Sequence, residues 1–142
     1  MAEKIELEIV TPARSVFDGK ADEVVLPGAQ GQLGVLPGHL PLLTSLDIGE
    51  LIVKEGGKTR RFGIEGGFAE VGPDRVTVLT EECYGVSDID IEHARQLMAE
   101  AEQEINRLEK LSTEELPEED LLAHHKKMLR RAQTQLLLHD KE

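Results

Sequence analysis

The sequence predicts a β + α protein, in which an N-terminal domain of short strands, a sandwich or barrel, precedes a C-terminal helical hairpin. All 13 glycines lie between Gly19 and Gly85, and five of the six prolines lie at or before Pro73. Because Gly and Pro mark turns, the first part should consist of many short elements. After Gly85, apolar residues recur at helical spacing. We therefore expect two domains, residues 1–87 and 88–142.

The strands of the first domain are indicated by alternation and by the turns that end them. Ile5, Leu7 and Ile9 alternate with Glu6 and Glu8, as in a half-buried strand. Turns recur at roughly the 8–12-residue spacing typical of a sandwich or barrel. Further strands, each bounded by a Gly- or Pro-containing turn, are expected at 24–26, 33–36, 51–53 and 75–80.

Two helices are expected in the second domain. The carboxylates of Asp88 and Asp90 suit the N-terminus of the first. Residues 112–120 combine capping residues, a proline and acids, and so separate the two helices. Both apolar seams are narrow, so the helices either cover each other as an antiparallel hairpin or pack against other chains. The seams are Ile91, Ala94, Met98, Ala101, Ile105 and Leu108 in the first helix, and Leu121, Leu122, Met128, Leu129, Ala132, Leu136 and Leu137 in the second.

The second helix is basic. Between residues 121 and 139 it carries Lys126, Lys127, Arg130 and Arg131 and no acid. Like charges four residues apart repel each other on a helix. An acidic surface, on the first helix or on another protein, would remove this repulsion; the alternative is a solvated helix face.

Composition excludes several classes of protein. With 28 acidic and 16 basic residues the formal charge is −12, which argues against nucleic acid as a partner. The single cysteine, Cys83, excludes an intrachain disulfide. No apolar run is long enough to span a membrane, and the N-terminus does not read as a signal peptide. We therefore expect a cytoplasmic protein.

The search for catalytic motifs is negative. No P-loop, zinc-ligand spacing or nucleophile elbow is present. His124 and His125 are adjacent on a helix and point about 100° apart, so we expect an exposed pair rather than a metal site. The acids before Cys83 would raise its pKa, so a structural cysteine is expected. We predict no catalytic residue and no metal.

Residues 28–43 form the most distinctive segment, with four glycines and two prolines among the first fourteen residues. Such a composition is typical of a rigid excursion of the backbone. Polar residues (Gln30, Gln32 and His39) lie among apolar ones (Leu40, Leu42 and Leu43). The segment is either an internal corner of the sandwich or a stiff loop that docks on another protein.

This segment, GQLGVLPGHLPLL, closely resembles the signature of the epsilon subunit of the rotary F-type ATP synthase, roughly G-x-L-G-[IV]-[LY]-P-G-H-x-P-L. A second match is residues 64–71, similar to S-G-G-[FI]-x-E-V, with Glu65 where serine is usual. Residues 76–79 are a third match, and the resemblance covers almost the whole chain. It implies a ten-stranded β-sandwich followed by two helices, in a non-catalytic subunit of the central rotor.

The resemblance also implies partners. The sandwich would bind the gamma subunit and the membrane c-ring, with Gln32, His39 and Leu42 as candidate contact residues. The helical tail would inhibit ATP hydrolysis by extending into the alpha/beta catalytic head, with Lys126, Lys127, Arg130 and Arg131 near an acidic segment of the beta subunit. Membrane association would be indirect and peripheral, on the cytoplasmic face of the inner or plasma membrane.

Some members of that family bind regulatory ATP between the folded helices, through [IL]-D-x-x-R-A. Here Asp90 and Ala94 match, but His93 replaces the arginine; of the second-helix arginines, Arg131 remains. Neutral groups cannot replace guanidinium forks on a polyphosphate, so we expect weak or no ATP binding and no cofactor. The alternatives are an ATP-binding sensor whose tail switches with nucleotide level, and a metal hydrolase built on His39 with Asp18 or Glu65.

Overall fold

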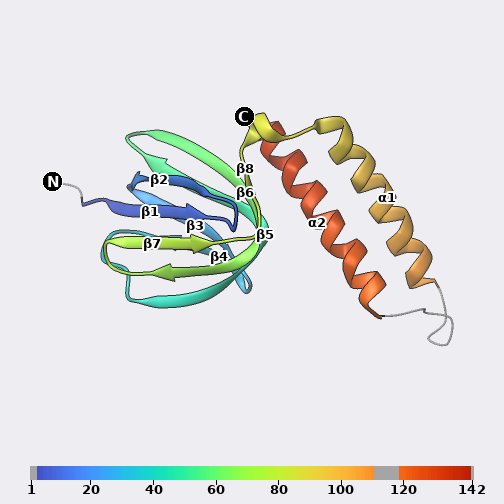
Figure 1. Ribbon diagram of the computed structural model, residues 1–142, viewed down its shortest axis with the longest axis horizontal. Coiled ribbons are helices and arrows are strands. Elements are labelled where there is room, and N and C mark those ends of the chain that lie inside the picture. The colour runs from blue at the N-terminus through green and yellow to red at the C-terminus, as the bar shows by residue number, and fades with distance from the viewer. Residues whose placement is uncertain (1–2, 111–118, 142) are drawn as a thin grey trace.

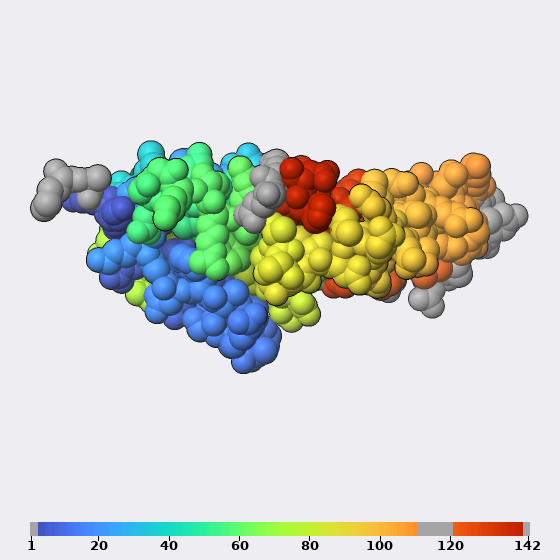
Figure 2. All heavy atoms as spheres, turned by 90° about the horizontal axis from the view of Figure 1, so that it is seen from above, coloured from blue at the N-terminus to red at the C-terminus, as the bar shows by residue number. Residues whose placement is uncertain are grey.

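The computed structural model describes residues 3–110 and 119–141 and shows a folded sheet beside two helices (Figure 1). Figure 2 shows the helices extending away from one side of the sheet. The elements are β1 (Ile5–Val10), β2 (Ser15–Ala21), β3 (Glu23–Gly28), β4 (Gly31–Val35), β5 (Leu42–Glu55), β6 (Lys58–Val71), β7 (Arg75–Leu79), β8 (Cys83–Tyr84), a short 3-10 helix (Val86–Asp88), α1 (Ile91–Glu109) and α2 (Glu119–Lys141).

The strands form one hydrogen-bonded sheet in the order β2-β1-β7-β6-β5-β3-β4, with β8 also paired to β6. The long strands β5 and β6 pair along their whole length with one interruption. Asp47 and Gly66 lie opposite each other but are not paired, and the register is the same on both sides of them. Before this point β5 pairs with β6 and meets β3 only at Leu46, which pairs with Gly28, whereas after it residues 52–54 of β5 pair with β3 on one side while β6 continues on the other. The two long strands therefore run through both layers of a β-sandwich.

This crossing corrects the expected strand count. The described residues contain eight strands, not ten. Two of the eight are 14 residues long, and each contributes one half to each layer. Positive φ angles at Gly66 (75°) and Gly67 (102°) accompany the crossing, a conformation that glycine adopts without steric cost. Counting each half separately would give five strands in each layer.

The core lies between the two layers and is mostly aliphatic. The alternation of β1 buries Ile5, Leu7 and Ile9, each fully inaccessible to solvent, as expected from the sequence. Strands β3, β4 and β7 confirm the expected strands near 24–26, 33–36 and 75–80. Strand β2 and the full length of β5 and β6 were not expected, because their burial patterns lack regular alternation.

The link between the sandwich and the helices is short, and two aspartates in it accept hydrogen bonds from backbone N–H groups. Asp88 accepts a hydrogen bond from the backbone N–H of Gly85 at 2.9 Å. Asp90 is the N-cap of α1 and accepts from the N–H of His93 at 3.1 Å, as the acids at this position predicted. The proposed domain boundary at residues 87 and 88 falls within this link and stays a prediction.

The helices form an antiparallel hairpin, and α2 also lies against β5 and β6 (Figure 1). Ala94, Ala101 and Leu108 of α1 are buried, as their spacing predicted. In α2 one part of the prediction is wrong, since Leu137 is 45% exposed whereas its neighbour Leu138 is fully buried. A single seam was assumed, but α2 contacts both α1 and the sandwich. No described helix is both long and apolar enough to cross a membrane.

Candidate functional site

The three candidate partner contacts lie close together in the sequence, on β4, on the turn after it and at the start of β5. Gln32 is exposed on β4, an edge strand of the sheet. His39 follows in the turn between β4 and β5, where its Nδ1 donates to the Leu40 carbonyl at 2.7 Å. Leu42 is the first residue of β5 and pairs with Val71. The structure places these residues at the surface and does not test their role.

Backbone hydrogen bonds hold this turn to the rest of the sandwich. The N–H of Gly38 donates to the Pro73 carbonyl at 2.7 Å, which ties the turn to the one between β6 and β7. Gly38 has a φ of 88°, and the His39 N–H donates to the Leu36 carbonyl at 3.2 Å. The sharp excursion of the backbone expected here is therefore present and is hydrogen-bonded to a neighbouring turn, and the side chains of Leu36 and Leu40 on it are exposed.

A second exposed apolar surface lies on the outer face of one layer. Phe68 on β6 and Leu79 on β7 are direct cross-strand partners, and both are more than half exposed. Leu43 on β5 is 70% exposed and pairs with Glu70, two residues from Phe68 on the same face. A shallow hollow beside Phe68 and Leu79 is also lined by Val10 and Pro12, among other residues. Large apolar side chains gathered on one face are typical of a protein-binding surface.

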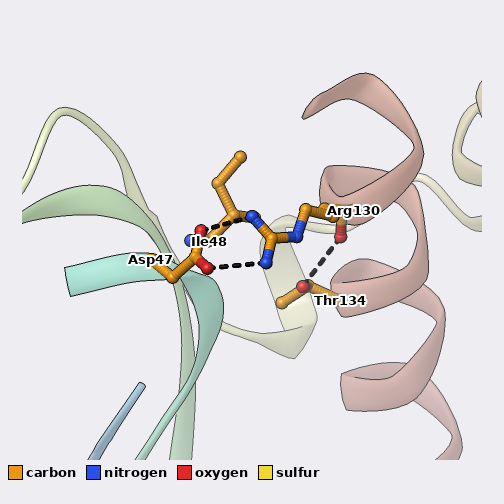
Figure 3. A network of polar contacts seen from close by, with 4 residues as sticks. All are labelled: Asp47, Ile48, Arg130 and Thr134. Atoms are coloured by element: carbon orange, nitrogen blue, oxygen red, sulfur yellow. Dashed lines mark hydrogen bonds and ion pairs between the residues drawn. The ribbon is translucent and has the colours of Figure 1, made fainter. Parts of the chain in front are cut away.

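Two arginines of the basic helix bind carboxylates of the sandwich. Both terminal nitrogens of Arg130 donate to Asp47, at 2.6 Å each, in a bidentate ion pair (Figure 3). Asp47 lies at the crossing of β5 between layers and also accepts from the Ile48 N–H at 2.9 Å. The Thr134 hydroxyl donates to the Arg130 carbonyl one turn earlier. This fork-to-carboxylate geometry is the strongest arrangement available to an arginine.

Arg131 makes the second ion pair, with Glu65 of β6. The Glu65 side chain is 5% exposed, and its own backbone N–H donates to the carbonyl of Glu82 and to the hydroxyl of Thr80. Within the described residues, the Nε of Arg131 and the hydroxyl of Tyr84 are buried without a hydrogen-bond partner. Burial raises the pKa of the Tyr84 hydroxyl, and the nearby Glu65 charge raises it further.

The two lysines are less engaged. Lys126 approaches Glu109 of α1 at 3.8 Å, with both side chains more than half exposed, so this pair contributes little. Lys127 has no ion pair within residues 3–110 and 119–141. The expected acidic partner of the basic helix is therefore mainly the sandwich, which was not among the alternatives considered.

The candidate nucleotide residues have structural roles here. Asp90 caps α1, and Arg131 is held by Glu65. Glu65 is thereby also unavailable for the metal site considered from the sequence. In the part of the chain that the structure describes, no group of three His, Cys, Asp or Glu side chains could hold a metal ion. Cys83 is half-buried, and desolvation raises its pKa to about 11, which favours the expected structural role.

Sequence reasoning missed Asp47, Phe68 and Leu79. Leu79 could have been found, because Val76 and Val78 point inward and the alternation then puts Leu79 outside. Glu65 was noticed only as a departure from a motif; a carboxylate between Ile64 and two glycines signals a buried partner. No local signal marks Asp47.

Together these features are those of a binding protein, in which a β-sandwich with exposed apolar surfaces carries a helical hairpin that is held to it by two ion pairs.

Comparisons with known proteins identify the family. Residues 4–85 match the sequence profile of the ATP synthase, Delta/Epsilon chain, beta-sandwich domain. An ATP synthase epsilon chain of a Synechococcus strain is 48% identical over 99 residues, covering 70% of this chain and 73% of that protein. One from Nitratidesulfovibrio vulgaris is 49% identical over 96 residues, covering 68% and 72%.

Solved structures show the same arrangement. A chain in the cryo-EM structure of the Euglena gracilis mitochondrial ATP synthase, which includes the c-ring, has a TM-score of 0.77 and 25% identity, covering 94% of this chain and 79% of that chain. A chain of the Tetrahymena thermophila mitochondrial ATP synthase central stalk and c-ring has a TM-score of 0.53 at 16% identity, over 98% of this chain and 96% of that chain, and supports the fold alone.

The chain belongs to the ATP synthase epsilon family. This confirms the resemblance found in the sequence and the prediction that the chain is not the catalytic subunit. The sandwich followed by two helices is confirmed as well, with the correction to the strand count given above.

Proposed function

We propose that the chain is a central-stalk subunit of a proton-translocating ATP synthase, which binds the gamma subunit and the c-ring through its sandwich and regulates ATP hydrolysis through its helical hairpin. It works at the cytoplasmic face of the inner or plasma membrane and is held there only by its partners. The observation that carries the proposal is the exposed apolar surface of a sandwich whose family is that of the epsilon chain.

Two surfaces support the docking role. The turn that contains His39 is rigid and presents Leu36 and Leu40, while Leu43, Phe68 and Leu79 line an outer face. Rigid loops need little ordering when they bind, so less of the binding free energy is lost. Gln32 on the adjacent edge strand offers an amide that both donates and accepts hydrogen bonds to polar loops of the ring.

The hairpin supports the regulatory role because it is joined to the sandwich mainly through one helix face. The core of the sandwich consists of residues from the first 78 positions, so it does not depend on α2. The hairpin can therefore leave the sandwich without unfolding it. Lys126 and Lys127, which are exposed, and the two arginines would then meet an acidic segment of the catalytic head.

Reconstitution tests this function. The complex is assembled with the full chain, or with a chain that ends at Ser87, and ATP hydrolysis is compared. We expect faster hydrolysis with the shortened chain, because the inhibitory helices are gone, with coupling to proton transport retained. Equal rates would remove the braking role from the hairpin. Failure of both chains to join the complex would contradict the docking role itself.

Regulation by ATP is the alternative, and we propose that it is weak or absent. Asp90 already caps α1, His93 replaces a cation, and Arg131 is occupied by Glu65. A polyphosphate would have to displace a buried carboxylate from the one remaining arginine. Calorimetry with ATP and the full chain is expected to show no binding, and a micromolar affinity would support the sensor instead.

A further inference from the structure

One side of the sandwich is open, because each layer ends there in a strand with a free edge. Within residues 3–110 and 119–141, β2 is the last strand of the sheet order and pairs only with β1. In the other layer, residues 58–62 of β6 pair with β5 alone among the described strands, since the pairing of β8 starts beyond them. Phe17 of β2 and Phe62 of β6 meet across this side, with ring centroids 5.6 Å apart. The two free edges therefore belong to the same side of the molecule.

A hollow of about 520 Å³ lies along this open side, between β2 and the β5–β6 hairpin. Phe17 and Val53 give it apolar lining, and Lys20, Lys58 and Arg60 give it three positive charges. Glu55 is the one acid in its lining. The hollow thus combines apolar surface with an excess of positive charge.

The three cations have no acidic partner within the part of the chain that the structure describes. Other exposed bases of the sandwich do have one, since Lys4 pairs with Asp22 and Lys54 with Glu23. The chain has 28 acidic residues against 16 basic ones, so acids are plentiful. Three unpaired bases around one hollow leave it ready to bind an anionic group from another molecule.

Arg60 is positioned by aromatic rings and not by a carboxylate. Its Cζ lies 5.4 Å from the ring centroid of Phe17 and 5.0 Å from that of Phe62, in cation–π contact with both. The Phe17 ring lies over Gly19, where an added Cβ would be only 3.0 Å from it. No other described residue forms a hydrogen bond with the guanidinium, so its N–H donors can receive a carboxylate.

The hollow is separate from the two surfaces proposed above for docking. At one end of β3, Glu23 pairs with Lys54 beside the hollow, and at the other end Gly28 pairs with Gly31, next to Gln32. A strand of six residues spans roughly 17 Å between these ends. Phe68 lies in the other half of β6, beyond the crossing between layers. A molecule bound in the hollow would therefore leave both of those surfaces free.

We propose that this open side binds an extended acidic segment of a partner protein, which adds to the sheet as a strand beside β2. Hydrogen bonds to the free backbone edge supply affinity, and carboxylates that meet Lys20, Lys58 and Arg60 supply specificity. The free edges favour a polypeptide over a small anion, because only a polypeptide can also pair with the backbone. A second copy of this chain is disfavoured, because each copy carries a formal charge of −12. This surface goes beyond the proposed binding of the gamma subunit and the c-ring and does not depend on it.

Binding is measured on the full chain by the fluorescence anisotropy of a labelled peptide of about twelve residues, in which Glu and Val alternate as in a half-exposed strand. The combined substitution Lys20→Gln, Lys58→Gln and Arg60→Gln should weaken binding by about tenfold, as expected for the loss of three ion pairs at a surface. The matched control, Lys110→Gln with Lys126→Gln and Lys127→Gln, removes three exposed bases from the hairpin. It should leave the affinity nearly unchanged.

A second peptide keeps every glutamate and replaces each valine by proline. Proline has no N–H and cannot pair along a strand, so this peptide should bind at least about tenfold more weakly. Amide hydrogen exchange then locates the bound valine peptide, which should slow exchange in β2 and not in α2.

Four results would overturn the proposal. They are no binding of the valine peptide to the unaltered chain, equal affinities of the sandwich variant and the hairpin variant, equal binding of the two peptides, and slower exchange confined to α2. The third would reduce the interaction to attraction between charges, and the fourth would place the peptide on the basic helix. None of these measurements requires assembly into an ATP synthase, so the proposed function is judged separately, by reconstitution.

Discussion

Leu138 is the position at which the docking of α2 can be weakened without a change in charge. It is fully buried, and its Cδ1 reaches β6, where a Cβ added at Gly63 would lie only 2.9 Å from it. The same added Cβ would overlap the ring of Tyr84 on β8. Leu138 therefore fills the space between helix and sandwich next to Tyr84, and Leu138→Ala would empty part of it.

The size of the effect follows from the apolar groups that the substitution removes. Leu to Ala removes three carbon groups, at about 0.8 kcal/mol each, or roughly 2.4 kcal/mol if solvent or neighbouring side chains fill the space. Buried Leu to Ala changes that leave a cavity cost up to about 5 kcal/mol. Because this interface lies at the edge of the sandwich and can relax, we expect about 2–3 kcal/mol. The destabilisation should fall on helix docking, since Leu138 is not part of the sandwich core.

Tyrosine fluorescence is a suitable assay, because the chain has one tyrosine and no tryptophan. Tyr84 lies at the interface, so its signal during urea unfolding reports on docking, while circular dichroism reports on the whole fold. In Leu138→Ala the fluorescence transition should move to lower urea, ahead of the loss of strand signal. Leu137→Ala is the matched control and should cost well under 1 kcal/mol, as this side chain is 45% exposed.

Two results would refute this reasoning. Equal effects of Leu137→Ala and Leu138→Ala would mean that the buried contact does not hold the helix. A single transition, shifted equally for both probes, would mean that hairpin and sandwich unfold as one unit, and the hairpin could not then leave the sandwich as a regulatory element.

Three further predictions concern the sandwich. Gly67→Ala should lower the free energy of unfolding in urea by at least about 1–3 kcal/mol, because the φ angle of Gly67 is 102° and the new Cβ would overlap the Leu79 carbonyl. Gly31→Ala is the control and should cost less, because its new Cβ would meet no atom within 4 Å. Cys83 has a pKa raised to about 11, so alkylation at pH 8 should be much slower than for a free thiol, and stability should fall as the pH rises above about 8.5, where the unfolded thiol ionises. Asp22 accepts from the Gly56 N–H, which together with Lys4 lowers its pKa; its stabilisation should be present above about pH 3.9 and lost on further acidification, and Asp22→Asn should remove that part of the acid transition.

The elements of the fold followed from local patterns in most of the chain. Alternation in β1 and the Gly and Pro turns located several strands, because side-chain period and turn chemistry are local properties. The helices and the cap at Asp90 followed for the same reason. These patterns did not predict the full length of β5 and β6. Each of these strands changes layer near its middle, so the alternation of buried and exposed residues is not continuous along the strand.

The candidate site was less accessible to sequence reasoning. For the four bases of α2 the sequence left two alternatives, an acidic partner surface or a solvated helix face, and two of the bases have acidic partners in the sandwich. Those partners were not identified, because Arg130 is 83 residues from Asp47 and Arg131 is 66 from Glu65. Pairing over such separations depends on how two long strands and a helix are placed, which no periodicity encodes.

The sequence by itself determined the division into a strand-rich part and a helical part, the absence of recognised catalytic motifs and, through residues 31–43 and 64–71, the family. Only the tertiary structure decided where β5 and β6 change layers, which apolar side chains remain exposed, and where the arginines of α2 bind. The physical reason is that backbone conformation responds to neighbours in the chain, whereas burial and charge pairing respond to neighbours in space. The sequence thus shows that the turn of α2 with Arg130 and Arg131 is basic, and the tertiary structure shows that these two residues bind the helix to the sandwich.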